Sequence, residues 1–429
     1  MSERYTRMLE TKSYKGLWWL PEKSGNQIPG TLTVEKNKIS LETIGVFGND
    51  NPLTHFSDRN ASRYDVIWGI SSDAKEISIF NCHESISLNF SSPFALAHYS
   101  AQVVAVGRHI ESLEELGNYD VTAYIEELSY WFKPNCLHSD LEEQRYTCRA
   151  EIQNTPHITV QIEKDCCLKI EGETQFSSSK TGLRMEFEQK SSLNFLFLKP
   201  ISIRDAVHKV FLFEQFLSFA TLTPVRSDRL LLIDKDKKSD PTENYIIEIY
   251  DDQEEERTSN PERFWKYLFV YDTIKEAFPA IINKWYAEKE MSPIRAHLID
   301  SVRKRDVFGS TDFLIVAQAV EGFYCRFRKD GLSLNSIITK LREEFSDVSK
   351  VELSDDDIKC ICDSRHYYSH LLPSGKKPNV KDGYALYILN HKLRKVLLCC
   401  MLNYFGFKNE EINSIFNKSN NSYLNRVVG

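Results

Sequence analysis

The sequence lacks the long apolar runs of membrane proteins. Its longest clean apolar run is Val396–Leu402, whereas a membrane-spanning helix needs about 20 such residues. The first residues, Met1–Leu9, are polar and charged, and this start predicts no secretory signal peptide. With 17 glycines and 14 prolines in 429 residues, the chain is also too poor in both to be a repeat fibre or a disordered linker protein.

The ten cysteines lack the spacing of a disulfide framework, and we therefore predict a reducing, cytoplasmic location. The sequence has no Walker A loop, no dinucleotide-binding glycine loop and no Gly-x-Ser-x-Gly motif. Their absence predicts no nucleotide cofactor and no hydrolase triad. A structural zinc site is a weak alternative, because its possible ligands include no Cys-x2-Cys pair: Cys82, His83, Cys136, His138, Cys148, Cys166 and Cys167.

The chain has enough apolar residues to form cores, and its charge is unevenly distributed. The chain is 41% hydrophobic and 12% aromatic, enough to fill the cores of two or three domains. The net charge of −7 is unevenly distributed, with +5 in residues 301–429 and −12 in the first 300 residues. This asymmetry predicts that an anionic partner binds the C-terminal part. Ordinary scatter of surface charge is the alternative.

Residues 14–198 have the pattern of short β-strands separated by turn residues. Apolar and polar residues alternate, or nearly alternate, in 31–36 and 39–44, and the turn-rich Ser71–Lys75 separates two strands of a predicted hairpin, 64–70 and 76–81. This spacing is typical of an antiparallel sandwich or barrel. The further predicted strands are 101–107, 121–132, 157–163, 168–171, 183–188 and 193–198.

The apolar spacing becomes helical after residue 200. Ser202 is a candidate N-cap for a helix that continues to Ala220, and the acidic segment 234–257 is predicted as an exposed excursion with room for one strand. The segment 382–404 is apolar on most sides and is predicted to be a central, buried helix. The other predicted helices are 260–274, 277–289, 293–306, 312–329, 333–345, 355–372 and 409–416.

These patterns predict an α+β multidomain protein. We expect an antiparallel, β-rich, sandwich-like domain over residues 1–200, a mixed helical connecting segment over 201–298 and an all-helical bundle over 299–429.

The chemically most informative stretch is Arg365–His370 (RHYYSH), within the helix predicted over 355–372. Histidine can take or deliver a proton near neutral pH, and arginine grips phosphate oxygens with two parallel hydrogen bonds. The pair suits RNA cleavage by attack of the ribose 2′-hydroxyl. The loop that follows supplies Lys376 and Lys377 for RNA binding.

The spacing of this pair raises a geometric difficulty. Five residues rotate by about 140° along an ideal helix, so Arg365 and His370 do not share a face. A kinked helix or a wrapped arginine side chain would bring them together. We favour a groove between two protomers, each of which supplies one motif.

The same helix permits two other interpretations. Asp363, His366 and His370 stand at i, i+3 and i+7 and do share a face, where a carboxylate and two imidazoles could hold Zn²⁺ or Mn²⁺. Alternatively, these are solvated or packed helix residues without chemistry.

The motif Arg365-His366-x3-His370 resembles the Arg-(Asn/His)-x3-His signature of the HEPN ribonucleases. The rest of the chain resembles the ApeA-like anti-phage proteins, and the resemblance spans both ends. It rests on Gly16–Pro21 (GLWWLP), the strand Gly30–Leu32 and the hairpin Ile67–Cys82.

The resemblance implies a bacterial abortive-infection endoribonuclease whose C-terminal bundle is a HEPN domain. A phage-encoded trigger would be sensed by the N-terminal domain, and the RNA cut would be tRNA. The resemblance further implies a homodimer or higher homo-oligomer that needs no metal or other cofactor and leaves cyclic-phosphate ends.

The resemblance also implies residue roles. Arg365 would steady the phosphate, His370 would transfer protons, and His366 would orient or support them. Glu321 matches an acidic residue on an earlier helix, and Asp363 is a second candidate for a supporting role. The alternative from another class is a catalytically silent binding protein, whose β domain recognises a phage component and whose bundle only dimerises.

Two further features have competing interpretations. Trp18 and Trp19 face opposite ways on a strand, so one of them is available for a ligand or partner unless both pack in the core and against the sheet. The acidic stretch Asp251–Glu256 is predicted as solvated surface, with shielding of the basic site as the alternative.

Overall fold

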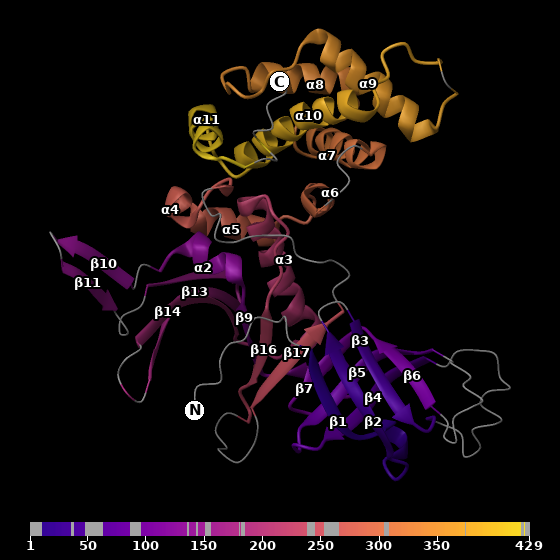
Figure 1. Cartoon of the computed structure of the whole chain (residues 1–429). Helices are drawn as coiled ribbons and strands as arrows, with labels where there is room; N and C mark the ends of the chain where they lie inside the picture. Colours follow the sequence, from indigo (N-terminus) through magenta and orange to yellow (C-terminus); the bar gives the residue numbers. More distant parts are fainter. Residues whose placement is uncertain are drawn as a thin grey trace. The chain divides into compact units, whose positions relative to one another are not determined.

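The chain folds into two compact units (Figure 1). The first unit comprises Met1–Glu126, Pro134–Phe211 and Arg226–Thr258, and the second comprises Glu127–Lys133, Leu212–Val225 and Ser259–Gly429. The structure, a computed structural model, describes residues 11–35, 38–47, 63–85, 96–134, 137–142, 145–150, 156–179, 181, 185–237, 245–252, 266–303, 309–373, 375–421 and 424, with the backbone alone described for 85, 137–142, 145–148 and 150.

The described part of the first unit consists mainly of antiparallel strands. Thirteen of them form one large sheet, and two short pairs, β10–β11 and β8–β15, lie outside it. The strands are β1 (Lys12–Trp19), β2 (Ile28–Glu35), β3 (Lys38–Ile44), β4 (Arg63–Ser71), β5 (Glu76–Ser85), β6 (Leu96–Ala101), β7 (Val103–Val106), β8 (Leu116–Gly117), β9 (Tyr119–Tyr124), β10 (Leu137–Glu142), β11 (Arg145–Ala150), β12 (His157–Glu163), β13 (Cys166–Ser178), β14 (Met185–Phe197), β15 (Ile201–Ser202), β16 (Arg229–Asp234) and β17 (Ile246–Asp251). A short 3₁₀ helix, Pro21–Lys23, follows β1.

The first six strands close on themselves. They pair in the order β5-β4-β1-β2-β3-β6, and β6 also pairs with β5. The six strands therefore form a closed ring, in which β6 bridges β3 and β5 and leaves no free edge there. Trp18, Leu32 and Ile67 are fully buried in its core. Trp19, on the opposite face of β1, is 7% exposed and contacts the His109 ring, so both tryptophans of the pair are packed.

The large sheet branches at Gln102. Strands β6 and β7 both pair with β5, and they do so in the same register: Ser100 of β6 lies opposite His83, and Val103 of β7 lies opposite Phe80. Beyond this point β7 also pairs with β17, and the sheet continues as β16-β9-β14-β13-β12. Opposite the branch, Asn81 has a φ of 53°, a left-handed conformation that asparagine tolerates better than most residues.

The second unit is helical in its described part. It contains residues of α2 (Glu126–Phe132) and the C-terminal half of α3 (Ile203–Thr221). All later helices also belong to it: α4 (Tyr271–Ile274), α5 (Phe278–Ala287), α6 (Ser292–Arg303), α7 (Ser310–Phe327), α8 (Leu334–Glu344), α9 (Asp355–His370), α10 (Gly383–Tyr404) and α11 (Asn409–Lys418).

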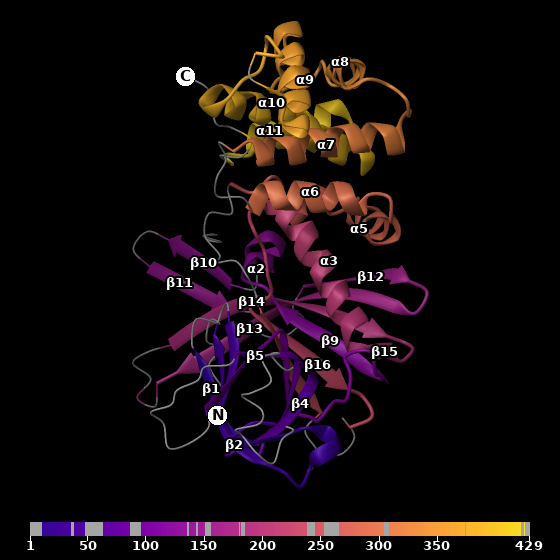
Figure 2. The same ribbon diagram turned by 90° about the vertical axis from the view of Figure 1, so that its right-hand side faces the viewer.

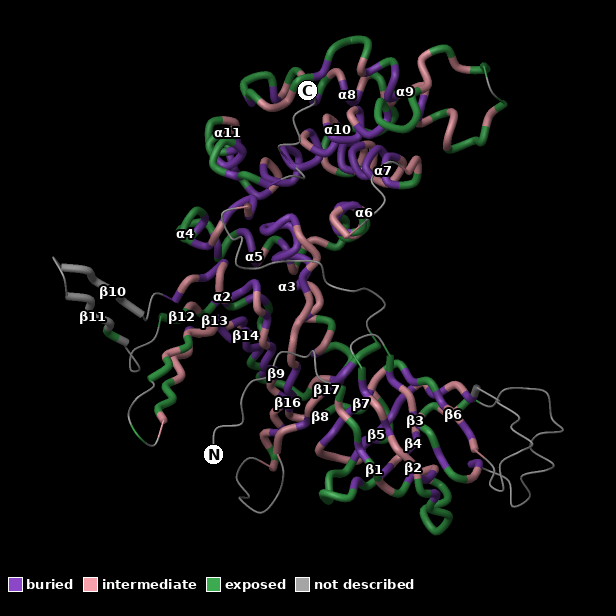
Figure 3. Tube along the Cα trace, viewed as in Figure 1, coloured by how far each residue is buried: buried purple, intermediate pink, exposed green. Residues whose placement is uncertain are grey.

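Helix α10 is the central helix of the second unit, as the sequence predicts. It runs beside α7 and close to α9 in two perpendicular views (Figure 2), and its residues are mostly buried (Figure 3). Apolar side chains on all sides explain this position, because a helix that is apolar all round must be covered on all sides.

An aromatic cluster forms a second part of this core. The Trp131 ring of α2 contacts Phe216 of α3, with centroids 5.7 Å apart, and also Tyr271 and Phe278. The Trp285 ring of α5 stacks on Phe219 at 6.0 Å. Segments far apart in the sequence therefore build one core.

The predicted α+β fold, with a β-rich N-terminal part and a helical C-terminal part, is confirmed. The helix beginning after Ser202 is also confirmed, since Ser202 Oγ accepts a hydrogen bond from the Asp205 backbone N–H at 3.1 Å. The predicted domain boundaries stay a prediction, although residues 298 and 299 both lie within α6. No helix in the described residues is long and apolar enough to span a membrane.

Two predicted elements are wrong in part. The strand predicted over 121–132 ends at Tyr124, and α2 follows it, because Leu128, Trp131 and Phe132 share one buried helical face. The helix predicted over 260–274 is α-helical only from Tyr271 among its described residues, and before it the Phe269 backbone N–H donates to the Ala220 carbonyl instead. Residues 253–256 of the acidic stretch lie outside the described residues.

Candidate active site on helix α9

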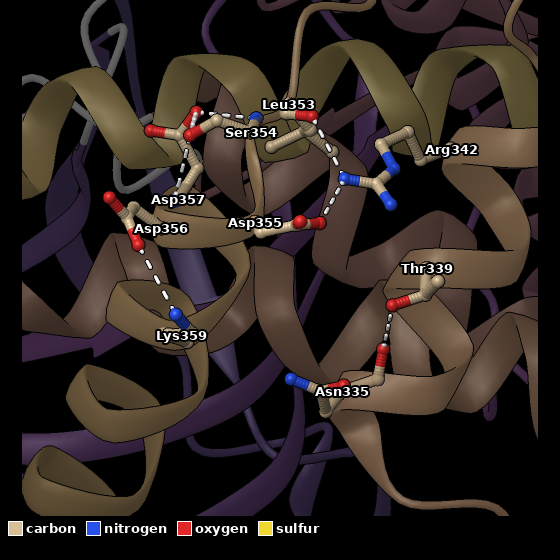
Figure 4. Close-up of polar contacts among 9 residues, drawn as sticks. All are labelled: Asn335, Thr339, Arg342, Leu353, Ser354, Asp355, Asp356, Asp357 and Lys359. Carbon is tan, nitrogen blue, oxygen red and sulfur yellow. Dashed lines mark hydrogen bonds and ion pairs between the residues drawn. The ribbon is translucent and has the colours of Figure 1, made fainter.

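The N-terminus of α9 is firmly fixed (Figure 4). The Ser354 side chain accepts a hydrogen bond from the Asp357 backbone N–H, and the Asp357 carboxylate accepts one from the Ser354 backbone N–H, which forms a capping box. Asp355 pairs at 2.7 Å with Arg342 of α8. Acidic residues in the first turn also complement the helix dipole.

Asp357 joins α9 to the central helix. Its carboxylate accepts a hydrogen bond from Lys392 of α10 at 2.7 Å. Partial burial opposes ionisation of Asp357, but the hydrogen bonds from Lys392 and Ser354 outweigh it and lower the pKa of this carboxyl group. The helix that carries the Arg365–His370 motif at its other end is therefore held in place at its N-terminus.

Arg365 and Glu321 form an ion pair between α9 and α7. Arg365 Nη2 donates to Glu321 Oε2 at 2.8 Å, and the two side chains are 27% and 30% exposed. Arg365 Nε is buried and has no hydrogen-bond partner among the described residues. The sequence-predicted Arg365 and Glu321 thus contact each other.

His366 and His370 lie side by side at the C-terminal end of α9. Both are exposed, and their ring centroids are 4.8 Å apart. Desolvation and the positive charges of Lys377, His370 and Arg365 lower the pKa of His366, against the opposing effect of Asp363. His366 is therefore mainly neutral at pH 7 and available as a hydrogen-bond acceptor.

Asp363 holds the following loop against α9. Its carboxylate accepts a hydrogen bond from the Asn379 side chain at 2.9 Å and lies 3.5 Å from Lys377 Nζ. Lys376, the other predicted RNA-binding lysine, is exposed. The sequence predictions missed Asn379, because its position at the end of a turn-rich loop shows no sign of a long-range contact.

Not all predicted site residues meet. In the described part of the chain, no hydrogen bond or ion pair joins Arg365 to His370. Helix α9 continues to His370 and ends there, where Leu371 takes a φ of 46°. Within one protomer, Arg365 is engaged with α7 and the two histidines are exposed together.

The described residues contain no cluster of side chains arranged to bind a metal ion. Across the described ranges, no three His, Cys, Asp or Glu side chains are placed to hold a metal ion, and Asp363 contacts Lys377 and Asn379 instead. Of the zinc candidates, Cys136 lies outside the described residues, as do the side chains of His138 and Cys148.

The motif helix lies within a match to a family model described as Apea-like HEPN, which covers residues 314–411. The C-terminal helical part is therefore that of a HEPN protein. A second model, described as ApeA N-terminal domain 1, matches residues 13–285, which is more than half of the chain. The chain belongs to the ApeA family, with an Apea-like HEPN domain at its C-terminal end.

Neither the curated proteins nor the solved structures include a match to this chain. The predicted resemblance to ApeA-like proteins is confirmed by the two family models. The N-terminal model ends at residue 285, beyond the boundary predicted at residue 200. HEPN domains are generally ribonucleases that bind RNA and dimerise, and the match supports a nuclease-type anti-phage function.

Proposed function

We propose that this protein is a metal-independent endoribonuclease of abortive infection. It stays latent until its N-terminal part senses a phage-encoded trigger, and it then cleaves RNA, with tRNA as the expected target. The supporting observation is the placement of Arg365, His366 and His370 at the exposed end of α9 within the Apea-like HEPN match.

The proposed reaction is transesterification within the RNA strand. The ribose 2′-oxygen attacks the adjacent phosphorus, the bond from phosphorus to the 5′-oxygen breaks, and a 2′,3′-cyclic phosphate and a 5′-hydroxyl form. His370 transfers a proton, either from the 2′-hydroxyl or to the leaving 5′-oxygen. His366, neutral at pH 7, supports it, and Arg365 stabilises the charge that develops on the phosphate oxygens.

We propose that two protomers complete each site. The Glu321 contact holds Arg365 toward α7, while His370 ends α9 about 140° further round the helix. A second copy that brings its own α9 alongside would supply the missing partner for each group. Glu321 then acts as a positioning residue for the arginine, while Lys376 and Lys377 attract the RNA backbone.

The test uses infected bacteria that carry the wild-type protein, His370→Ala or the control His157→Ala, which removes an exposed histidine of β12. Small RNAs are separated on a denaturing gel, and their ends are analysed. We expect discrete tRNA fragments with cyclic-phosphate ends from the wild type and the control, and none from His370→Ala.

A His370→Ala protein that cleaves RNA and protects cells like the wild type would overturn the proposal. Intact RNA together with protection that does not require His370 would instead identify a binding protein without catalysis. Arg365→Ala should slow cleavage by roughly 100- to 1,000-fold, the usual loss when a transition-state hydrogen bond is removed.

A further inference from the structure

The second unit exposes few large apolar side chains in its described part. Only Leu371, at 86%, and Tyr384, at 54%, are strongly exposed there. They flank the connection between α9 and α10, which begins directly after His370. Exposed apolar groups confined to one place on a surface mark a binding site more often than chance scatter does.

This connection is tied closely to the motif helix. The Lys381 backbone N–H donates to Ser364 Oγ at 3.0 Å, and Tyr368 Oη donates to the Lys381 carbonyl at 2.9 Å. Lys381 precedes Tyr384 by three residues, so the start of α10 is held next to the last turns of α9. Tyr384 therefore belongs to the same local surface as the motif.

The Tyr384 ring rests on a fixed support. It stacks on Tyr387, with centroids 6.0 Å apart and an interplanar angle of 27°. Tyr387 is only 5% exposed and meets His391 edge to face at 4.5 Å. One face of an exposed ring is thus packed against a buried pair, while the residue itself is presented to solvent.

The charges around this surface favour a polyanion. Between residues 363 and 384 there are four Lys or Arg residues and two Asp residues, and Lys376 and Lys381 are exposed. A basic surface with an exposed aromatic ring is the usual composition of a site for single-stranded nucleic acid, where bases stack on aromatic rings and cations follow the backbone.

We propose that Tyr384 stacks on an unpaired base next to the phosphate that is cut, and that this surface selects single-stranded RNA over duplex RNA. This inference rests on the proposed function and specifies its substrate. Bases in a duplex are already stacked on one another and cannot offer a free face to Tyr384. Leu371, which directly follows His370 and has a left-handed φ of 46°, is the other exposed apolar residue of this connection.

The experiment measures binding without cleavage. Full-length His370→Ala protein is titrated, at one fixed salt concentration, into a labelled short single-stranded RNA and into the same sequence as a duplex. Fluorescence anisotropy gives Kd. Three further proteins in the same background are compared: Tyr384→Ala, Tyr384→Phe and Phe176→Ala, the last a matched exposed aromatic residue of β13 that is 47% exposed.

We expect tighter binding of the single strand than of the duplex. Tyr384→Ala should weaken single-strand binding by roughly 5- to 150-fold, the range for loss of one stacked base. Tyr384→Phe and Phe176→Ala should change it little.

Equal binding of the two RNAs, or an unchanged Kd for Tyr384→Ala, would overturn the inference. Light scattering of the same proteins measures their oligomeric state and tests whether this surface binds protein. If Tyr384→Ala lowers the oligomeric state, the surface binds a second copy of the chain rather than RNA. In each case the His370→Ala result in infected cells still decides the proposed function separately, because it depends on cleavage and not on this surface.

Discussion

At the scale of single residues, the second unit holds a buried ion pair. Asp312 of α7 pairs with Arg394 of α10, and both side chains are nearly inaccessible. Asn390 donates a second hydrogen bond to the same Asp312 oxygen at 2.7 Å. A charge left alone at such a depth is costly, whereas the intact pair adds little to stability over apolar packing.

Single substitutions in this pair should therefore cost more than a double one. Asp312→Ala or Arg394→Ala should each lower the free energy of unfolding by about 3–5 kcal/mol, because each leaves one buried charge without its partner. Asp312→Leu combined with Arg394→Met should cost clearly less. Hydrogen exchange of amides in α7 and α10 measures the difference. If the double variant loses as much as both single variants together, the pair is not coupled.

The pKa of His366 offers a second residue-scale test. Lys377 lowers this pKa and Asp363 raises it. Lys377→Ala should therefore raise the pKa of His366, and Asp363→Asn should lower it further. NMR titration of labelled histidine rings checks both signs, with His157 as a distant reference. Shifts in the same direction for both variants would contradict the charge assignment.

At the scale of elements, α9 depends on its first turn. Removing the N-cap with Ser354→Ala should cost about 1 kcal/mol, which corresponds to roughly fivefold faster exchange of amides in the first turns of α9. Ser369→Ala, an exposed position at the other end of the helix, is the control. We expect the faster exchange in the first turns only, and unchanged exchange would show that the contacts of Arg342 and Lys392 fix this end without the cap.

Most elements could be predicted from the sequence because their local patterns agree with their tertiary setting. The Asp382–Tyr404 stretch is apolar on most sides, and it becomes the buried α10. The failure at α2 has the opposite cause. Its sequence, EELSYWF, has the aromatic content of a strand, and only the distant partners Phe216, Tyr271 and Phe278 make a helix the better solution.

The residues of the candidate site are proposed from the sequence, whereas their contacts could not be predicted from it. Residue types and spacing point to Arg365, His366 and His370. The bond from Arg365 to Glu321 joins residues 44 positions apart, and Asn379 reaches Asp363 across a loop. No local pattern encodes such distances, since they depend on how α7, α9 and the loop pack together.

At the scale of the whole molecule, the second unit has a core that the C-terminal sequence does not supply alone. Trp131 and the end of α3 contribute aromatic rings to it. Trp131→Ala should therefore destabilise the second unit by about 3–5 kcal/mol, seen as faster amide exchange in α5. Trp68→Ala, which removes a ring stacked on His109 in the first unit, should leave α5 unchanged. The reverse pattern would contradict the division into two units.

The order of the segments has a consequence for synthesis on the ribosome. The chain passes between the two units five times, and β17, the last strand of the large sheet, ends at Asp251. The 178 residues of this sequence that follow Asp251 take roughly 9 to 36 s to translate at typical rates. The β-rich unit can assemble once β17 is made, while Trp131, Phe216 and Phe219 lack their partners Phe278 and Trp285 only until α5 has been translated. Helix α9, which carries Arg365 and His370, is made after β17, so under the proposed function a chain that stops before α9 would have no means of cutting RNA.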